Sequence, residues 1–514
     1  MLGSSFMLAK INSYGLNGLV GFNIQVEVDI TFGTPHYEVV GLPDASVKES
    51  KERVRSAIKN SLLKFPVHKI TVNLAPANTR KEGSSFDLAI ATSILVASEQ
   101  VNAINAKNYV YIGELGLDGS IKPVRGILPL LISAREKGYT NFIIPFENQK
   151  EASYIAGVNV YALSSLSQLV GFLNETQKVE KVANNTWAVD NAAFDVEDFA
   201  RVKGQHAVKR AMEIAVAGGH NILMAGPPGA GKTMLARCVP GILPDLTFEE
   251  ALEVTKIHSI AGVLDPDKGV ITSRPFRSPH HTATNVALTG GGKDAKPGEI
   301  SLAHNGVLFL DEMPEYSRNC LETLRQPLED GVVTVSRAAG TYEYPANFIL
   351  VASMNPCPCG NYGSRELTCT CSPTQISKYL KKLSGPLLDR IDIKVDVDRV
   401  AFVDLRTEAS EEPSSAVKKR VDAARKIQQE RFSGTNVYCN AKMNSKQIKE
   451  FCKIDSLSEQ ILQTAFEKFA MSARGYTRIL KVARTIADLE AEPNILARHI
   501  TEAINYRNID KVQI

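Results

Sequence analysis

The stretch Gly226-Pro-Pro-Gly-Ala-Gly-Lys-Thr233 decides the fold of this chain. It fits the phosphate-loop pattern G-x-x-x-x-G-K-[ST], and it stands between an apolar run, Asn221–Ala225, and a helical pattern, Met234–Val239. A strand, a glycine-rich loop and a helix in this order let successive backbone N–H groups turn onto phosphates. The sequence therefore predicts a nucleotide-binding α/β domain with a parallel sheet.

Each position of this loop is expected to bind nucleotide: Gly226, Pro227, Pro228, Gly229, Ala230, Gly231, Lys232 and Thr233. The lysine reaches the β- and γ-phosphates, and the threonine hydroxyl is a ligand for Mg²⁺. The predicted ligands are thus ATP and Mg²⁺. A chance glycine-rich turn would rarely supply strand, loop, Lys-Thr pair and helix together.

Polar side chains end two further apolar strands. Val307–Leu310 runs into Asp311 and Glu312, and the strand beginning at Phe348 ends at Asn355. A carboxylate at the end of a buried parallel strand lies beside the phosphate loop, so Asp311 is predicted to hold Mg²⁺. Glu312 is suited to activate the attacking water, and Asn355 to position that water near the γ-phosphate.

Arginines complete the predicted catalytic set. Arg390 follows a short helix, where it can reach the γ-phosphate of a neighbouring subunit. Arg474 opens a helix near the end of the chain and could sense nucleotide in its own subunit, with Arg478 as the second candidate. Surface ion pairing is the competing explanation for each of them.

Several unusual segments resemble the magnesium-chelatase-like AAA+ ATPases of the ComM/YifB type along nearly the whole chain. They are Val40–Asp44, Arg274–Thr282, Ala303–Gly306, Leu324–Asp330, Met354–Gly360 and Val482–Asp488. The resemblance implies a homo-hexameric ring with a helix-2 insertion, Thr282–Pro297, and a hairpin, Gly331–Tyr344. It also implies a helicase that drives branch migration of DNA during homologous recombination in natural transformation, with recombination proteins as further partners.

The residues themselves support DNA binding only weakly. The Gly290–Lys293 turn and Arg337 could present cations to a DNA backbone inside a ring. The basic helix Ala416–Phe432 is more simply a solvated face. Two other functions stay open: a chelatase motor subunit that drives metal insertion into a porphyrin, and an unfoldase or protease. A separate N-terminal domain favours the DNA motor over the chelatase.

Composition and hydrophobic pattern predict the domain organisation of the chain. Its 514 residues predict several domains, and 44% hydrophobic with 22% charged residues is typical of a soluble protein. No stretch is apolar enough for a membrane helix and Met1–Lys10 is no signal peptide, so a cytoplasmic location is expected. The expected domains are residues 1–176, a linker at 177–195, an AAA+ core at 196–407 and a helical lid at 416–514. Residues 408–415 are read as a second linker.

The N-terminal domain resembles the α/β fold of Lon proteases but lacks their catalytic pair. Ser85 occupies the position of the nucleophile, whereas the position of the lysine partner falls on Leu128. Lys122 lies too early in that segment to replace it. A serine without a base is a poor nucleophile, so no peptidase activity is predicted.

Four of the eight cysteines are clustered, as Cys357-Pro-Cys359 and Cys369-Thr-Cys371. Four thiolates suit tetrahedral Zn²⁺, which could fix a loop that has no core of its own. The C-x-C spacing is less diagnostic than C-x-x-C, so free thiols and a redox role remain as alternatives.

Overall fold

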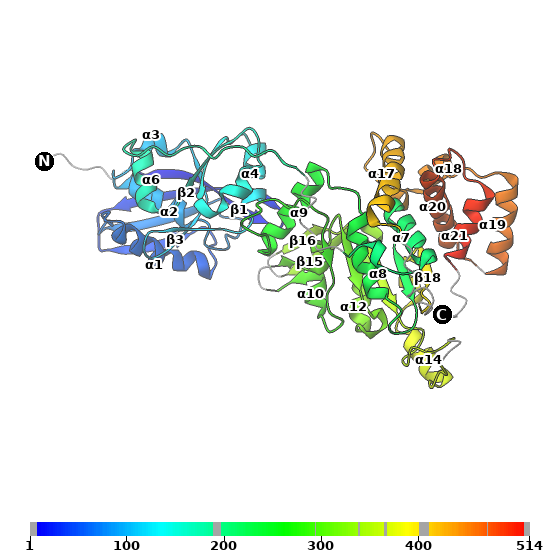
Figure 1. Cartoon of the computed structure of the whole chain (residues 1–514). Helices are drawn as coiled ribbons and strands as arrows, with labels where there is room; N and C mark the ends of the chain where they lie inside the picture. Colours follow the sequence, from blue (N-terminus) through cyan, green and yellow to red (C-terminus); the bar gives the residue numbers. More distant parts are fainter. Residues whose placement is uncertain are drawn as a thin grey trace. The chain divides into compact units, whose positions relative to one another are not determined.

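The computed structural model describes residues 8–188, 197–292, 295–337, 340–363, 367–399, 411–469 and 471–507. These residues form two compact units (Figure 1). The first contains Met1–Ala188, Phe248–Thr272 and Ser336–Tyr344, and the second contains Val189–Thr247, Ser273–Val335 and Pro345–Ile514. The segments of the two units therefore interleave along the chain.

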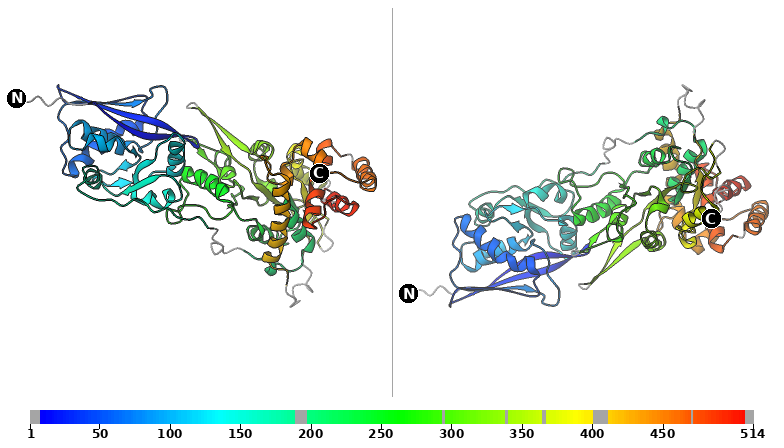
Figure 2. Two further views of the ribbon diagram at one scale, coloured as in Figure 1. Left: turned by 90° about the horizontal axis from the view of Figure 1, so that it is seen from above. Right: turned by 90° about the horizontal axis from the view of Figure 1, so that it is seen from below.

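The first unit is built on a mixed sheet. Its strands, in spatial order, are β3 (His36–Val40), β4 (Lys69–Ala75), β2 (Val20–Thr31), β1 (Ala9–Asn17), β5 (Val110–Tyr111), β8 (Asn141–Pro145) and β9 (Asn159–Leu163). The long antiparallel pair of β1 and β2 is the dark blue ribbon of Figure 2. Every second residue of β2 from Ile24 to Ile30 is buried, because alternate side chains of a strand face opposite sides.

Helices cover this sheet. They are α1 (Ala45–Asn60), α2 (Asp87–Ala97), α3 (Ala103–Ala106), α4 (Ile127–Glu136), α5 (Gln149–Ala152), α6 (Leu166–Leu173) and α9 (Phe248–Ala261), with a small β6–β7 pair (Glu114–Leu115, Ile121–Lys122). All residues of α2 are buried, which explains why the sequence of this helix is apolar on every side. The expected linker begins by packing on the first unit, since Val182 N–H donates to the Val160 carbonyl.

The second unit contains the parallel sheet predicted from the phosphate-loop motif. Its strand order is β11 (Phe276–Arg277), β14 (Val307–Leu310), β17 (Ile349–Met354), β10 (Ile222–Ala225) and β18 (Ile393–Asp396). Every residue of β10, β14 and β17 is buried, as expected for central strands with both faces covered. The predicted fold class is confirmed in this sheet and in the mixed sheet of the first unit.

Helices of the second unit surround the sheet and form a helical domain at the end of the chain. They are α7 (His206–Gly218), α8 (Lys232–Cys238), α10 (Asn285–Thr289), α11 (Glu299–Leu302), α12 (Arg318–Thr323), α13 (Arg325–Asp330), α14 (Pro373–Leu380), α15 (Gly385–Leu388), α17 (Ser414–Arg431), α18 (Ser445–Phe451), α19 (Ser456–Lys468), α20 (Ala473–Leu489) and α21 (Ala497–Asn505). α17 to α21 are orange to red in Figure 1, and α20 and α17 pack on α7. None of the helices within the described residues is long and apolar enough to cross a membrane.

Two hairpins occur where the family resemblance implied insertions. β12 (Gly290–Gly291) pairs with β13 (Lys296–Pro297) after α10, and β15 (Val332–Arg337) pairs with β16 (Gly340–Pro345), which is light green in Figure 2. Lys293 and the side chain of Arg337, the two cations predicted to contact DNA, lie outside the described residues. Residues 408–410 of the second expected linker also lie outside the described residues.

Candidate active site

The phosphate loop joins the carboxyl end of β10 to the amino end of α8. Its backbone needs glycine at particular positions: Gly229 and Gly231 have φ values of 76° and 85°. These values lie in the left-handed region that glycine enters without steric cost. Gly226 needs to be glycine for another reason, since a Cβ atom there would lie 2.2 Å from the Val397 carbonyl oxygen. The backbone of the loop therefore requires glycine at these three positions.

Lys232 is buried at the start of α8 and its ammonium group is held by oxygen atoms. Its Nζ donates to the carbonyls of Gly226 and Pro227 at 2.7 and 2.9 Å, and to Asn355 Oδ1 at 3.0 Å. Burial lowers the pKa of Lys232, and the nearby carboxylates of Asp311 and Glu312 oppose that shift. The structure thus brings together Lys232 and Asn355, which the sequence had predicted separately.

Asp311 lies beside the phosphate loop and accepts hydrogen bonds on both oxygens. Thr233 Oγ1 donates to Oδ2 at 2.8 Å, and Ser353 Oγ donates to Oδ1. A hydroxyl and a carboxylate at this separation are hard oxygen ligands that suit Mg²⁺, so the residues present fit the predicted ion. Ser353 was missed in the sequence; the signal was a polar residue inside an otherwise apolar buried strand.

The backbone of Glu312 has a strained, left-handed conformation. Its φ and ψ are both 49°, a left-handed conformation that a non-glycine residue adopts at a cost of about 1 kcal/mol or more. Its N–H donates to Ser353 Oγ at 3.1 Å, which helps to hold this conformation. The side chain is exposed, so a water molecule can reach its carboxylate.

Arg390, Arg474 and Arg478 gather around one cavity of about 280 Å³ in the second unit. Arg390 pairs with Glu329, Arg474 lies 3.7 Å from the same carboxylate, and Arg478 pairs with buried Asp392. Burial lowers the pKa of the Arg390 guanidinium, and the neighbouring arginines lower it further. Further lining cations are Lys442 and Lys481. Glu329 was not predicted, because nothing in the sequence near it marks it as a partner of these arginines.

This cavity lies at the amino edge of the parallel sheet, and the phosphate loop lies at the carboxyl edge. Asn221, directly before β10, donates from Nδ2 to the Arg390 carbonyl, whereas Gly226 directly follows β10. The four residues of β10, at about 3.3 Å each, separate the two edges by about 13 Å. The expectation that Arg474 senses the nucleotide of its own subunit stays a prediction.

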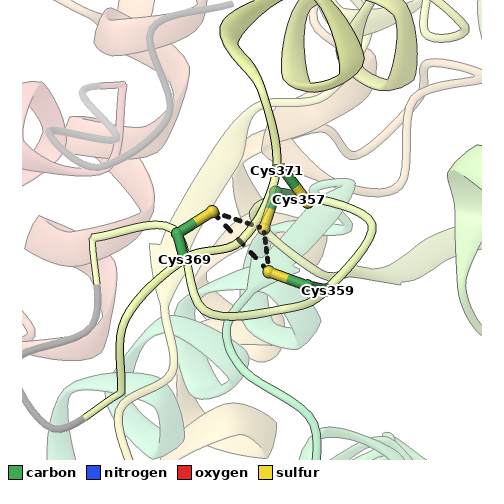
Figure 3. A group of neighbouring side chains, drawn as sticks. All are labelled: Cys357, Cys359, Cys369 and Cys371. Carbon is green, nitrogen blue, oxygen red and sulfur yellow. Dashed lines mark hydrogen bonds between the residues drawn. The ribbon is translucent and has the colours of Figure 1, made fainter.

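The four clustered cysteines lie in the loop between β17 and α14, and their sulfur atoms converge (Figure 3). Cys357 Sγ is 3.3 Å from Cys359 Sγ and 3.7 Å from Cys369 Sγ, and the last two are 3.6 Å apart. Backbone N–H groups of Asn361 and Thr370 lower the pKa of Cys359. Such a group of thiols could hold a metal ion.

The residues considered for a Ser-Lys pair lie in the N-terminal domain in different surroundings. Leu128 is buried on α4 and Lys122 is exposed, while Ser85 forms no side-chain hydrogen bond to any part of the chain that the structure describes. A buried lysine that we had not considered, Lys81, donates to the Pro76 carbonyl, and burial lowers its pKa. The absence of peptidase activity stays a prediction.

The five-stranded parallel sheet carries a phosphate loop, a pair of acids at the end of one strand and an amide at the end of another, and a helical domain follows it. These features define an AAA+ type of P-loop protein. Family models agree along the chain. The model described as "Magnesium chelatase, subunit ChlI" matches residues 198–405, "Subunit ChlI of Mg-chelatase" matches 26–148, and "Magnesium chelatase, subunit ChlI C-terminal" matches 411–507.

Relatives that match nearly the whole chain identify the family more specifically. Competence protein ComM of Haemophilus influenzae is 43% identical over 504 residues, covering 97% of each chain. YifB of Salmonella typhimurium is 42% identical over 508 residues, covering 99% of this chain and 98% of the relative. The magnesium-chelatase 38 kDa subunit of Chlorobaculum parvum is 23% identical over 328 residues, covering 59% of this chain and 87% of that subunit. The chain belongs to the ComM/YifB family of magnesium-chelatase ChlI-like AAA+ proteins, and this membership implies ATPase activity.

Proposed function

We propose that this protein is a hexameric, ATP-dependent DNA motor. It promotes branch migration and strand uptake in the cytoplasm, during homologous recombination in natural transformation. The ATPase half of the proposal rests on the convergence of these side chains. Thr233 Oγ1 lies 2.8 Å from Asp311 Oδ2, and Lys232 Nζ lies 3.0 Å from Asn355 Oδ1. Residues from three separate segments thus converge on the place where the phosphates of ATP would bind. The DNA half is supported by the competence name of a relative that matches 97% of the chain.

The residues of this site suit hydrolysis of the bond between the β- and γ-phosphates of ATP. Lys232 and the loop N–H groups offset negative charge on the phosphates, and Mg²⁺, when bound by Thr233 and Asp311, adds a second positive charge there. Asn355 orients the attacking water, and Glu312 accepts its proton as the new P–O bond forms and ADP leaves. The strained Glu312 backbone directs that carboxylate toward the water.

The arginine cavity supports a ring of subunits. Arg390 and Arg474 lie at the sheet edge opposite their own phosphate loop, and Arg478 lines the same cavity. A neighbouring subunit could therefore present its γ-phosphate to these cations, and the phosphate would replace Glu329 as the partner of Arg390. Under this proposal all three arginines act on the nucleotide of the neighbour, whereas for Arg474, and for Arg478 as second candidate, the sequence had suggested a role in their own subunit.

A chelatase motor and an unfoldase remain as alternative functions. The model that matches residues 26–148 is itself described as a chelatase subunit, so the N-terminal domain does not by itself exclude a chelatase. Coverage favours the DNA motor: the competence relative matches 97% of this chain, and the Chlorobaculum subunit matches 59%.

ATP turnover in the presence of different DNA substrates tests the proposal. Single-stranded, duplex and four-way branched DNA of matched length are each added to the full chain, and phosphate release is followed with Lys232→Ala as the background. We expect branched DNA to bind and to raise turnover most. If branched DNA neither binds nor changes turnover while basal hydrolysis continues, the DNA-motor proposal is wrong and the ATPase assignment stands.

A further inference from the structure

The spacing of the cysteine sulfurs fits one tetrahedral metal ion. Zn–S bonds of about 2.3 Å in a tetrahedron place the sulfurs about 3.8 Å apart. The observed separations are 3.3, 3.6 and 3.7 Å, and all four sulfurs lie within 4.8 Å of one another. A cluster of several iron atoms would need its thiolates further apart. A single ion with four sulfur ligands is therefore the arrangement that this loop can hold.

The backbone around the cysteines is arranged for thiolates. The Tyr362 N–H donates to Cys357 Sγ at 3.3 Å, and the N–H groups of Asn361 and Thr370 point to Cys359 Sγ. Outer hydrogen bonds of this kind orient metal ligands and tune the metal. Three of the four cysteines are half-exposed, so little apolar packing is available to hold this loop. A metal ion would supply the missing cross-link between Cys357–Cys359 and Cys369–Cys371.

The same loop contacts the ATPase site at two points. Gly360 packs so closely on the phosphate loop that a Cβ atom there would lie 2.3 Å from Pro228 Cδ. At the far end of the loop, α14 carries the buried Tyr379; burial raises the pKa of its hydroxyl, and the nearby Asn355 backbone opposes that rise. Asn355 in turn accepts from Lys232 at 3.0 Å. A metal ion that links the two ends of the loop would therefore restrict the positions of both Pro228 and Asn355.

We propose that Cys357, Cys359, Cys369 and Cys371 bind one Zn²⁺, and that this zinc centre positions the phosphate loop and Asn355 for ATP hydrolysis. The inference rests on the ATPase half of the proposed function and is independent of DNA. The zinc takes no part in the chemistry. Because a displacement of about 1 Å in an active site can cost up to about 10²-fold in rate, loss of zinc is expected to reduce basal ATP turnover by about 10- to 100-fold.

The test combines metal content with nucleotide binding and turnover, all without DNA. The full chain is purified without chelator and compared with the double variant Cys369→Ser plus Cys371→Ser. Cys320→Ser is the matched control, because Cys320 donates to Asn285 Oδ1 at 2.6 Å and a serine hydroxyl can replace that bond. We expect about one zinc per chain in the native and control proteins, and loss of zinc, ATP affinity and turnover in the double variant.

Removing the metal from the native chain covers the case in which the double variant does not fold. A zinc chelator is applied and excess Zn²⁺ is then restored, with Mg²⁺ constant and helix content followed by circular dichroism. Reversible loss of turnover at constant helix content supports the proposal. A folded native protein without zinc, or with iron in its place, would refute the zinc centre. Loss of zinc with unchanged ATP binding and turnover, or with global unfolding, would refute the positioning role.

Discussion

The proposed function assigns different tasks to Lys232 and Glu312, so their substitutions are expected to separate binding from chemistry. Lys232→Ala removes the cation proposed to bind the phosphates, and we expect nucleotide binding to be lost. Glu312→Gln keeps the shape of the side chain but cannot accept a proton, so binding is retained and hydrolysis falls by about 10²-fold or more. Fluorescent-nucleotide binding and phosphate release measure the two effects.

Glu315→Gln is the matched control for Glu312→Gln. Glu315 is an exposed acid three residues after Glu312, and it pairs with Lys382. This control should leave both binding and hydrolysis unchanged. Substantial turnover by Lys232→Ala or by Glu312→Gln would mean that the roles assigned here are wrong.

At the scale of secondary-structure elements, the start of α4 depends on a buried carboxyl group. Glu151 of α5 accepts from the Leu128 N–H at 3.1 Å and from Ser259 Oγ of α9 at 2.5 Å. Ser259 Oγ also accepts from the Gly126 N–H at 3.0 Å. Burial raises the pKa of Glu151 to about 7, against a usual value of 4.5. Within the first unit, α9 is therefore linked to α4 and α5 through the Glu151 carboxyl group, whose pKa lies near neutral pH.

The raised pKa of Glu151 predicts that the first unit loses stability as pH rises. The folded state holds this proton more tightly than the unfolded state does, so the contribution is full below about pH 4.5 and is lost as pH approaches and passes 7. The rise of this pKa from 4.5 to about 7 corresponds to about 3 kcal/mol. Glu151→Gln stays neutral, so we expect it to unfold at higher urea than the native chain at pH 8, and at similar urea at pH 4.5.

Trp187 reports on this unfolding, because its ring packs 5.9 Å from that of Phe248 on α9 and it is the single tryptophan of the chain. Its fluorescence is followed in urea at both pH values. Glu147→Gln, which changes an exposed carboxyl close to Glu151 in sequence, is the control and should follow the native chain. An equal difference between Glu151→Gln and native protein at the two pH values would contradict the prediction.

At the scale of the whole molecule, the proposed ring predicts that Arg390 acts on the nucleotide of a neighbouring subunit. The phosphate loop and the Arg390 cavity lie at opposite edges of one sheet, so under this proposal a complete active site combines two subunits. We expect Arg390→Ala to assemble and bind ATP but to lose turnover by about 10³- to 10⁵-fold, as for arginine fingers. Mixing it with Lys232→Ala should restore part of the turnover, because a mixed interface can combine an intact loop with an intact arginine.

The control for this experiment is Lys381→Ala, which changes an exposed cation that does not line the cavity. It should retain native turnover alone and in mixtures. Mixed rings that demonstrably assemble, by light scattering or cross-linking, and yet recover no turnover would count against a role of Arg390 in the neighbouring subunit.

The amino-acid sequence by itself predicted which residues form the candidate nucleotide site. Each of its parts is a short local pattern: a glycine-rich loop between a strand and a helix, and polar residues directly after apolar strands. The observed strands β10, β14 and β17 lie within a residue or two of the predicted ones. Parallel strands align their carboxyl ends, so knowing the order strand, loop, helix was enough to expect Lys232, Asp311 and Asn355 to converge.

Only the tertiary structure decided which edge of the sheet carries the arginines and which segments build each unit. Glu329 and Arg390 are 61 positions apart, and Glu151 and Ser259 are 108 apart. No local pattern marks such partners, because a surface ion pair and a buried hydrogen bond are made by the packing of distant elements. The same reason explains the inclusion of Phe248–Thr272 in the first unit: its apolar and polar contacts there exist only once the chain has folded.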